Sequence, residues 1–233
     1  MKVARVFPRK TNASPTDPLC FFNNPPQILE TGDPLLDINE VHVSVTFTYD
    51  MKKAEELAFQ WESLGKPVKL DGPAFGKPSG EFIPGMYLDK KYVITSRGCS
   101  NNCWFCYVPK RQGGLIELDI KDGHYLQDDN ILGCSEPHIR KVFEMLGRQK
   151  ERPVFSGGLE AKLLKPWHVQ LLQKVKPKEM FFDYDTPDDL DPLIIAGKML
   201  NEAGFTLRSR KAFCYVLIGY KGDTIDKAEK RIF

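Results

Sequence analysis

The 233-residue sequence has no long apolar run, no export signal and no marked excess of one charge. None of its apolar stretches approaches the roughly 18 residues that a membrane-spanning helix requires. The N-terminal segment MKVARVFPRK lacks the apolar core of a signal peptide. Lys and Arg number 33 and Asp and Glu 31, so a net charge of +2 does not indicate nucleic acid binding. These absences predict a cytoplasmic protein without a membrane partner.

Cysteine is also scarce, and half of the six cysteines stand alone in the sequence. Cys20, Cys134 and Cys214 are expected to be small apolar core residues, because unpaired cysteine is often buried. The other three are crowded together with C-x3-C-x2-C spacing: Cys99, Cys103 and Cys106. This spacing argues against a disulfide framework and points to chemistry in one loop.

Residues 1–88 predict a small Rossmann-like α/β domain. Residues 41–47 alternate apolar and polar side chains and are rich in β-branched residues, which indicates a strand. Residues 51–64 place apolar side chains at helical spacing, and Asp50 precedes them as a candidate N-cap. The Gly- and Pro-rich segment 71–85 is expected to be a linker to the second domain or a lid.

Residues 89–233 predict a second domain in which strands and helices alternate. The expected strands are residues 92–96, 124–130, 153–156, 180–184 and 212–220. The expected helices are residues 136–146, 166–175, 187–203 and a last one from 224. This alternation predicts an α/β fold with a parallel sheet or a partial (βα) barrel. Residues 114–119 break the alternation, because they are extended where a helix would be expected.

The cysteine loop directly follows the first predicted strand of this domain, where α/β proteins commonly place their chemistry. A structural zinc site would need a fourth ligand, for which His124 and Cys134 are the nearest candidates. Thiol–disulfide chemistry would use Cys103 and Cys106 and leave Cys99 unexplained. A [4Fe–4S] cluster held by the three cysteines leaves one iron open for a substrate, and this interpretation accounts for all three.

The cysteine spacing, with Phe105 before the last cysteine, closely resembles the radical S-adenosylmethionine superfamily. The resemblance implies a [4Fe–4S] cluster bound by Cys99, Cys103 and Cys106, whose open iron binds the methionine part of S-adenosylmethionine. It further implies reductive cleavage to a 5′-deoxyadenosyl radical, which abstracts hydrogen from an unidentified substrate. The electron donor would be a small redox protein such as a ferredoxin or flavodoxin.

Further residues of the cofactor site are implied by the same resemblance. Phe105 and the backbone near Tyr107 would contact the adenine, as would Ile218 and Gly219 after the fifth strand. Gly157 and Gly158 correspond to the family's Gly-Gly-Glu segment, although Leu159 is inserted before Glu160. Glycine at such positions lets the backbone approach a ligand closely.

Polar residues follow the other predicted strands. Asp183 and Asp185 share one face of a strand and could both reach a ribose diol, while Asp185 could equally cap the following helix. Asp128, Asp129 and Asn130 could contact a ligand or cap a turn. Arg208 and Arg210, before the fifth strand, could meet a phosphate or carboxylate or lie solvated.

Two features depart from the families that the chain resembles. Partial barrels of the radical S-adenosylmethionine type commonly have six strands, and here five are visible and the sixth is missing. The N-terminal domain loosely resembles the cobalamin-binding Rossmann-like domain but lacks its Asp-x-His-x-x-Gly signature. A non-catalytic iron–sulfur or zinc module and a cobalamin-assisted methyltransferase are therefore the alternative hypotheses.

Overall fold

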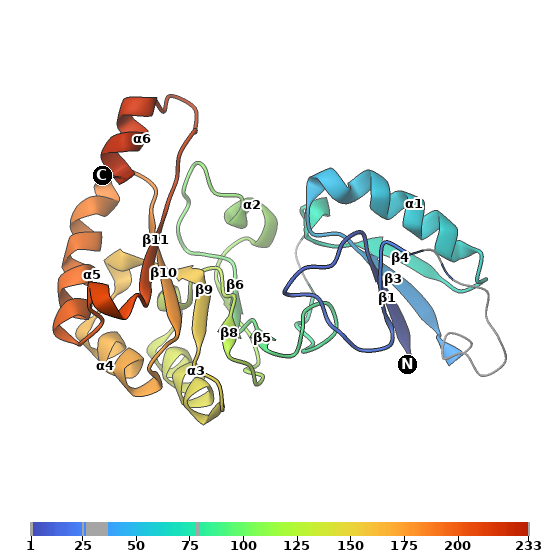
Figure 1. The fold of residues 1–233 in the computed structure, drawn as a ribbon, viewed down its shortest axis with the longest axis horizontal. Helices are drawn as coiled ribbons and strands as arrows, with labels where there is room; N and C mark the ends of the chain where they lie inside the picture. The colour runs from blue at the N-terminus through green and yellow to red at the C-terminus, as the bar shows by residue number, and fades with distance from the viewer. Residues whose placement is uncertain (1, 25, 27–36, 78–79, 233) are drawn as a thin grey trace. The chain divides into compact units, whose positions relative to one another are not determined.

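The computed structural model describes residues 2–24, 26, 37–77 and 80–232 (Figure 1). The chain divides into two compact units, Met1–Lys90 and Lys91–Phe233. Residues 78 and 79 of the predicted linker lie outside the described residues. No helix in the described ranges has the length and apolar character needed to cross a membrane.

The first unit is built on a parallel sheet of four strands in the order β2-β1-β3-β4. The strands are β1 (Val3–Phe7), β2 (Cys20–Phe22), β3 (Glu40–Ser44) and β4 (Val68–Asp71). Helix α1 (Met51–Glu62) connects β3 to β4. Short 3-10 turns occur at Thr48–Asp50 and Pro73–Phe75. The predicted strand and helix of this unit are both present.

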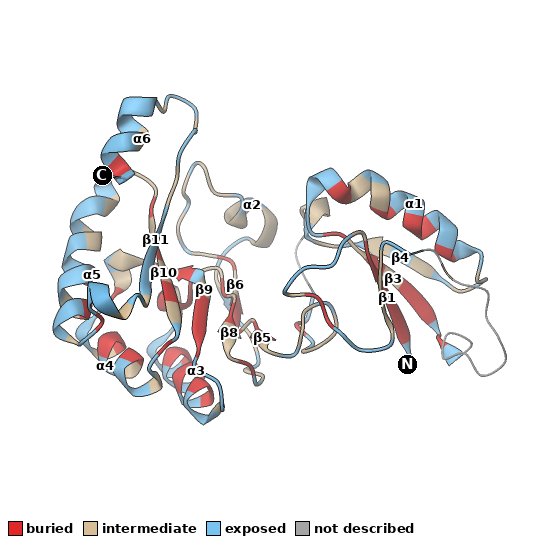
Figure 2. Ribbon diagram, viewed as in Figure 1, coloured by how far each residue is buried: buried red, intermediate tan, exposed pale blue. Residues whose placement is uncertain are grey.

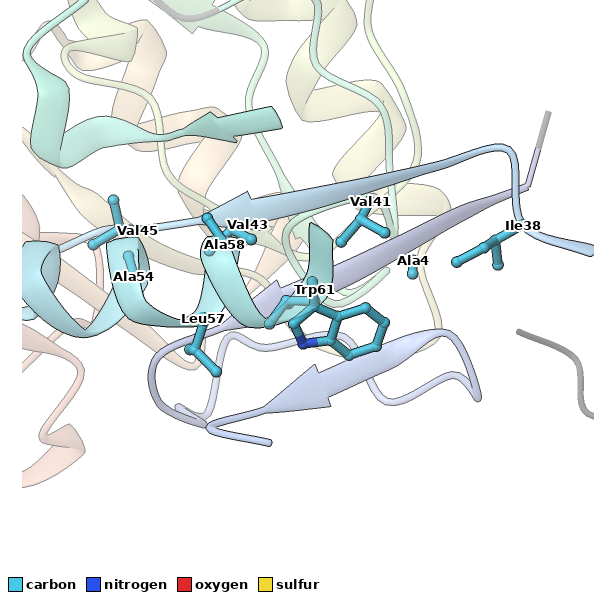
Figure 3. Close-up of a cluster of buried hydrophobic side chains, with 10 residues drawn as sticks. Ala4, Ile38, Val41, Val43, Val45, Ala54, Leu57, Ala58 and Trp61 are labelled. Carbon is cyan, nitrogen blue, oxygen red and sulfur yellow. The ribbon is translucent and has the colours of Figure 1, made fainter. Parts of the chain in front are cut away.

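The core of the first unit lies between α1 and one face of the sheet (Figure 3). Alternate residues of β3 and its extension, Val41, Val43 and Val45, are buried against it. Trp61 of α1 is fully buried, its ring centroid lies 4.8 Å from that of Phe21, and its Nε1 donates to the Asn24 carbonyl at 2.9 Å. The alternating apolar side chains of β3 and the helically spaced apolar side chains of α1 thus pack into one cluster.

Asp50 stands at the N-cap position of α1 as expected, but its side chain makes no capping hydrogen bond. Both carboxylate oxygens instead accept from the Arg9 guanidinium, at 2.5 and 2.6 Å. The expected cap is therefore wrong in its chemistry, because a bidentate ion pair takes both acceptor oxygens.

The second face of this sheet bears a row of polar residues in register. Cys20, Arg5, His42 and Lys69 are direct neighbours across the four strands. Arg5 is buried and its Nη1 donates to the Gly85 carbonyl at 3.1 Å. His42 Nδ1 lies 2.5 Å from the Tyr87 hydroxyl. Residues 85–87 therefore cover this face by hydrogen bonding.

The second unit contains a parallel sheet of five strands in the order β11-β10-β9-β8-β5. Its strands are β5 (Tyr92–Val93), β8 (Tyr125–Leu126), β9 (Val154–Leu159), β10 (Glu179–Tyr184) and β11 (Ala212–Val216). The sequential order confirms the predicted parallel α/β fold. Among the described residues β5 and β11 each have a neighbouring strand on one side only, so the sheet is open, and the partial barrel stays a prediction.

Helices α3 (Glu136–Arg148), α4 (Pro166–Val175) and α5 (Leu190–Glu202) connect the later strands, and α6 (Ile225–Ile232) follows β11. Single 3-10 turns occur at Ile131–Gly133, Ala161–Leu163, Pro187–Asp189 and Leu207–Ser209. Strand β9 and the inner side of α3 are largely buried, whereas β11 is mostly exposed (Figure 2).

The first predicted strand of this unit, residues 92–96, is two short strands. After β5 the chain turns into β6 (Ser96–Arg97), which pairs antiparallel with β7 (Ile116–Glu117). The extended segment at 114–119 is thereby confirmed. Helix α2 (Val108–Gln112) lies between β6 and β7 in the chain.

The isolated cysteines are not uniformly core residues. Cys134 is buried, Cys20 is partly exposed, and Cys214 is exposed on the edge strand β11. The expectation for Cys214 is wrong, because the first four residues of β11, Cys214 among them, are exposed.

Candidate functional site

The candidate site lies at the carboxyl ends of the parallel strands of the second unit. The cysteine loop follows β6, the polar triplet 128–130 follows β8, and Asp183 stands near the end of β10. Parallel strands bring their carboxyl ends to one edge of a sheet, so these segments meet there.

Two of the three cysteine sulfurs, those of Cys99 and Cys106, receive hydrogen bonds from their own loop or from the segment after β8. The Asn101 N–H donates to Cys99 Sγ and the Val108 N–H donates to Cys106 Sγ, each at 3.4 Å. The side-chain amide of Asn130 donates to Cys99 Sγ at 3.5 Å. All three cysteines are partly exposed. Such N–H donors stabilise thiolates and tune thiolate-bound clusters.

Cys103 shows how the three sulfurs influence one another. Burial raises the pKa of the Cys103 thiol first, and the negative charges of Cys106 and Cys99 raise it further. Lys162 acts in the opposite direction. Three thiolates in one loop repel each other, and a bound cationic centre relieves that repulsion. The donor set therefore fits a thiolate-bound cluster.

The distances between these side chains are not those of a closed metal site. Within residues 2–24, 26, 37–77 and 80–232, no three His, Cys, Asp or Glu side chains are grouped closely enough to hold one metal ion. His124, a candidate fourth zinc ligand, precedes β8 and so stands at the opposite edge of the sheet. The zinc hypothesis loses that ligand.

Asp128 fixes the segment that leads into the cysteine loop. Its carboxylate is 1% exposed and accepts from the Thr95 N–H at 2.6 Å, the Thr95 hydroxyl at 2.6 Å and the Ser96 hydroxyl at 2.7 Å. Burial raises its pKa although these hydrogen bonds lower it. Asp128 also explains the split strand, because it takes the Thr95 N–H that a continuous ladder would use.

Asp129 and Asn130 join the start of the loop to the end of β9. Asp129 Oδ2 accepts from the Gly98 N–H at 2.7 Å. The Asn130 amide, which donates to Cys99, also donates to Glu160 Oε2 at 2.7 Å. In the described part of the chain the buried Asn130 Oδ1 has no hydrogen-bond partner. The triplet thus connects the start of the cysteine loop to the end of β9.

Strand β9 contains a bulge at the predicted glycine pair. Phe155 pairs with Met180 and Leu159 pairs with Phe182, so β9 has two more residues than β10 between these pairs. A bulge re-aims the backbone and is common beside active sites. It also accounts for the inserted Leu159, which returns to the ladder and is buried.

Both positions of this bulge require glycine, but for different steric reasons. A Cβ on Gly157 would lie 2.0 Å from the Asp128 carbonyl oxygen. Gly158 has φ +95°, and a Cβ there would lie 2.8 Å from Asp183 Oδ2. Close approach of backbone to backbone and to a carboxylate therefore requires glycine at both positions. The structure brings Gly158 and Asp183 together.

The carboxylates near β10 are destabilised as anions. Burial raises the pKa of Asp183 to about 6, and the charges of Asp185, Asp189 and Glu160 add to the effect. Burial and Asp189 also raise the pKa of Asp185. A ligand that donates hydrogen bonds here would stabilise the charged forms.

Asp185 does not cap the following helix. Thr186 caps the 3-10 turn Pro187–Asp189, Asp189 occupies the N-cap position of α5, and Asp189 Oδ2 accepts from the Thr186 N–H at 2.8 Å. The helix-capping alternative for Asp185 is therefore wrong, and the ribose contact stays a prediction.

Aromatic rings connect Phe105, which is predicted to contact the adenine, to the turn after β11. The Trp104 ring packs edge-on against Phe105 and Tyr220, each with centroids 5.3 Å apart. Gly219, next to Tyr220, has φ +77° and its N–H donates to Asp223 Oδ2 at 2.8 Å. The cysteine loop therefore contacts the turn after β11.

Arg231 of α6 holds that turn in place. Its side chain is 3% exposed, binds Asp223 at 2.7 Å and donates to the Leu217 carbonyl at 2.9 Å. Ile218 and Tyr107 are 56% and 57% exposed, so the protein itself does not enclose either.

Two cationic residues of this edge were not anticipated. Arg97 directly precedes Gly98, and burial lowers its pKa while Asp129 raises it. Lys162 lies 3.0 Å from Asp189 Oδ1, and the hydrogen bond to Asp189 raises the pKa of Lys162, with the charges of Glu160 and Cys103 adding to the effect. Sequence position is the available signal: Arg97 stands two residues before Cys99, and Lys162 stands four residues after Gly158.

Comparison with known proteins finds a partial similarity. Over 68 residues the chain is 34% identical to the ribosomal protein uS12 methylthiotransferase RimO of Rhodopseudomonas palustris strain BisB5, which covers 27% of this chain and 15% of that protein. The same protein of strain ATCC BAA-98 / CGA009 gives the same values. The RimO protein of Bradyrhizobium sp. strain BTAi1 / ATCC BAA-1182 is 32% identical over 68 residues, which cover the same 27% of this chain and 15% of that protein. No protein-family model and no solved structure matches the chain.

Proposed function

We propose that the second unit is the catalytic unit of a radical S-adenosylmethionine enzyme that binds a [4Fe–4S] cluster through Cys99, Cys103 and Cys106. The observation that supports this most directly is the hydrogen-bonded path from Cys99 through Asn130 to Glu160. That path joins the cysteine loop to the end of the β9 bulge.

When bound, the cluster would supply the electron that cleaves S-adenosylmethionine. The protein residues would bind and orient the cofactor. The bulge at Gly157 and Gly158 offers backbone groups to the methionine ammonium, and Glu160 and the free Asn130 Oδ1 offer acceptors nearby. Asp183 and Asp185 would accept from the ribose hydroxyls.

The adenine would lie against the aromatic residues of the loop and of the turn after β11. The Trp104 ring already contacts Phe105 in the loop and Tyr220 in the sequence-distant turn after β11. Ile218 and Gly219 would border the same ring, and the backbone near Tyr107 would bind it. A small redox protein, a ferredoxin or flavodoxin, would deliver the electron.

The similarity to methylthiotransferases supports the class of reaction. Attaching a methylthio group to a carbon requires that a hydrogen on that carbon be removed. Hydrogen abstraction is the chemistry proposed for this site, while the substrate of this chain is not assigned.

The test is anaerobic reconstitution with iron and sulfide, followed by electron paramagnetic resonance with and without S-adenosylmethionine. We expect a reduced-cluster signal that changes shape on adding the cofactor, and formation of 5′-deoxyadenosine. Cys103→Ala is expected to abolish both, while Cys214→Ala, on the exposed edge strand, retains both. A cluster signal that ignores S-adenosylmethionine would instead identify a non-catalytic iron–sulfur module.

A further inference from the structure

The amino edge of the five-stranded sheet, opposite the cysteine loop, presents a row of basic residues. A basic residue stands at or next to the position before each strand. They are Lys91 before β5, His124 before β8, Arg152 before Pro153 and β9, Lys178 before β10 and Lys211 before β11. We call this row the basic rim.

Backbone hydrogen bonds continue the sheet into the rim and fix its order. The His124 N–H donates to the Lys91 carbonyl at 2.9 Å, and the Lys178 N–H donates to the Pro153 carbonyl at 2.8 Å. The Met180 N–H donates to the Lys211 carbonyl at 2.8 Å. Neighbouring strands lie about 4.8 Å apart, so five positions span about 19 Å.

A cavity of about 590 Å³ opens within the rim. Its lining residues are Lys91, His124, Tyr125, Lys150, Glu151, Arg152 and Lys178. Four of these are permanent cations and one is a carboxylate, so the cavity holds more positive charge than the net +2 of the whole chain. The total charge of the chain does not indicate nucleic acid binding, because it does not reveal this local concentration of positive charge.

Three cations that line the cavity, Lys150, Arg152 and Lys178, are only weakly neutralised by the described part of the protein. Lys178 Nζ lies 3.9 Å from Glu179, at the limit of an ion pair. No described residue forms an ion pair with the exposed Lys150 or Arg152. Lys91 Nζ lies 5.5 and 5.8 Å from the ring centroids of Tyr92 and Tyr125. The charges of Lys150, Arg152 and Lys178 therefore remain available to an external anion.

We infer that the basic rim binds the sugar–phosphate backbone of a nucleic acid. A linear series of cations matches the linear series of phosphates in a nucleic acid strand, whereas a single phosphate ion would contact only one or two of these cations. The concave site also suits a strand better than a bilayer surface, and no large exposed apolar side chain stands among the lining residues to insert into lipid. Arg208 and Arg210 extend the row beside Lys211.

The experiment measures binding of the full chain to a fluorescent 20-nucleotide single-stranded RNA, to DNA of the same sequence and to inorganic phosphate. Log affinity against log salt concentration should fall with a slope near −3, because each phosphate contact of a single strand contributes about −0.7. The triple variant Lys150→Glu, Arg152→Glu, Lys178→Glu should bind at least about 30-fold more weakly and lose about two units of that slope.

The matched control reverses three exposed lysines of α3 and α6: Lys141→Glu, Lys227→Glu and Lys230→Glu. Circular dichroism verifies that both triple variants are folded. Similar affinities of the two variants would overturn the inference, as would binding of inorganic phosphate alone or a salt-independent affinity. If the rim variant binds both RNA and DNA more weakly than the wild type does, the inference is supported. A difference in wild-type affinity between the two would then identify the preferred nucleic acid.

Discussion

The two units have parallel sheets of the same kind but place their ionisable residues differently. In the first unit they lie within the strands and pair with one another: Glu40 lies 2.7 Å from Lys69 Nζ and 3.0 Å from His42 Nε2. In the second unit they stand near or just after the carboxyl ends of the strands, as Asp183 and Asp128 do. A parallel sheet thus supports paired ionisable residues within its strands and a candidate site at its carboxyl edge.

The pKa shifts of two carboxylates express the same difference. The hydrogen bond from Lys69 lowers the pKa of Glu40, so that carboxylate is stabilised as an anion. Burial and neighbouring carboxylates raise the pKa of Asp183. A carboxylate destabilised by its surroundings marks a place where a ligand, rather than the protein, completes the hydrogen bonding.

The largest expected effect comes from Gly157→Ala. The new Cβ would meet the Asp128 carbonyl, and Asp128 fixes the start of the cysteine loop, so we expect loss of cluster binding and destabilisation by more than about 3 kcal/mol. Iron content after reconstitution and urea unfolding measure the two effects. Gly147→Ala in α3, where the nearest atom would lie 4.0 Å from the Cβ, is the control. Normal iron binding in Gly157→Ala would show that the bulge does not shape the site.

Trp61→Ala should have the next largest effect, confined to the first unit. Truncating a fully buried tryptophan costs about 3–5 kcal/mol. Hydrogen–deuterium exchange by mass spectrometry should show lost protection in β1, β3 and α1 and unchanged protection in β9 and β10. Phe59→Ala, on the exposed side of the same helix, should leave exchange unchanged. Equal loss of protection in both units would mean that they unfold together, and the comparison would fail.

Asp183→Asn should have the smallest effect on stability, and that effect depends on pH. The pKa of Asp183 is about 6 in the folded protein and near 4 when unfolded, so stability is full below about pH 4 and falls as pH rises to 6. The Asp183→Asn variant has no carboxyl group at this position, so its stability does not fall in this way between pH 4 and pH 6. It should be more stable than wild type by about 1–2 kcal/mol at pH 7.5, since partial exposure reduces the effect, and no more stable at pH 4.

Thermal unfolding at both pH values tests this, with the exposed Asp188→Asn as control. The same Asp183 variant should bind S-adenosylmethionine more weakly. Equal stability gains at both pH values would show that the carboxylate is not strained by its surroundings.

Local patterns predicted the elements well and their ends poorly. The alternation at Val41, Val43 and Val45 and the helical spacing before Trp61 depend only on near neighbours in sequence, so both elements were found. The expected strand 92–96 is interrupted because Thr95 donates to Asp128, 33 residues away. No local pattern contains such a contact.

The site shows the same limit. The cysteine spacing gave the three sulfur residues directly, and glycine at 157 and 158 indicated close backbone approach. Glu160 was harder to place, because the inserted Leu159 breaks the sequence motif. In three dimensions the β9 bulge absorbs the extra residues, and Glu160 reaches Asn130.

The length of the strands sets a distance rule for anything that uses both edges of the second sheet. Strands β9 and β10 have six residues each, and at about 3.3 Å per residue they separate the two edges by about 20 Å. A nucleotide held at the basic rim is therefore too far from the cysteines to react there. The rim would serve as an anchor, and the reacting group must come from another part of the bound assembly, one able to reach around the sheet.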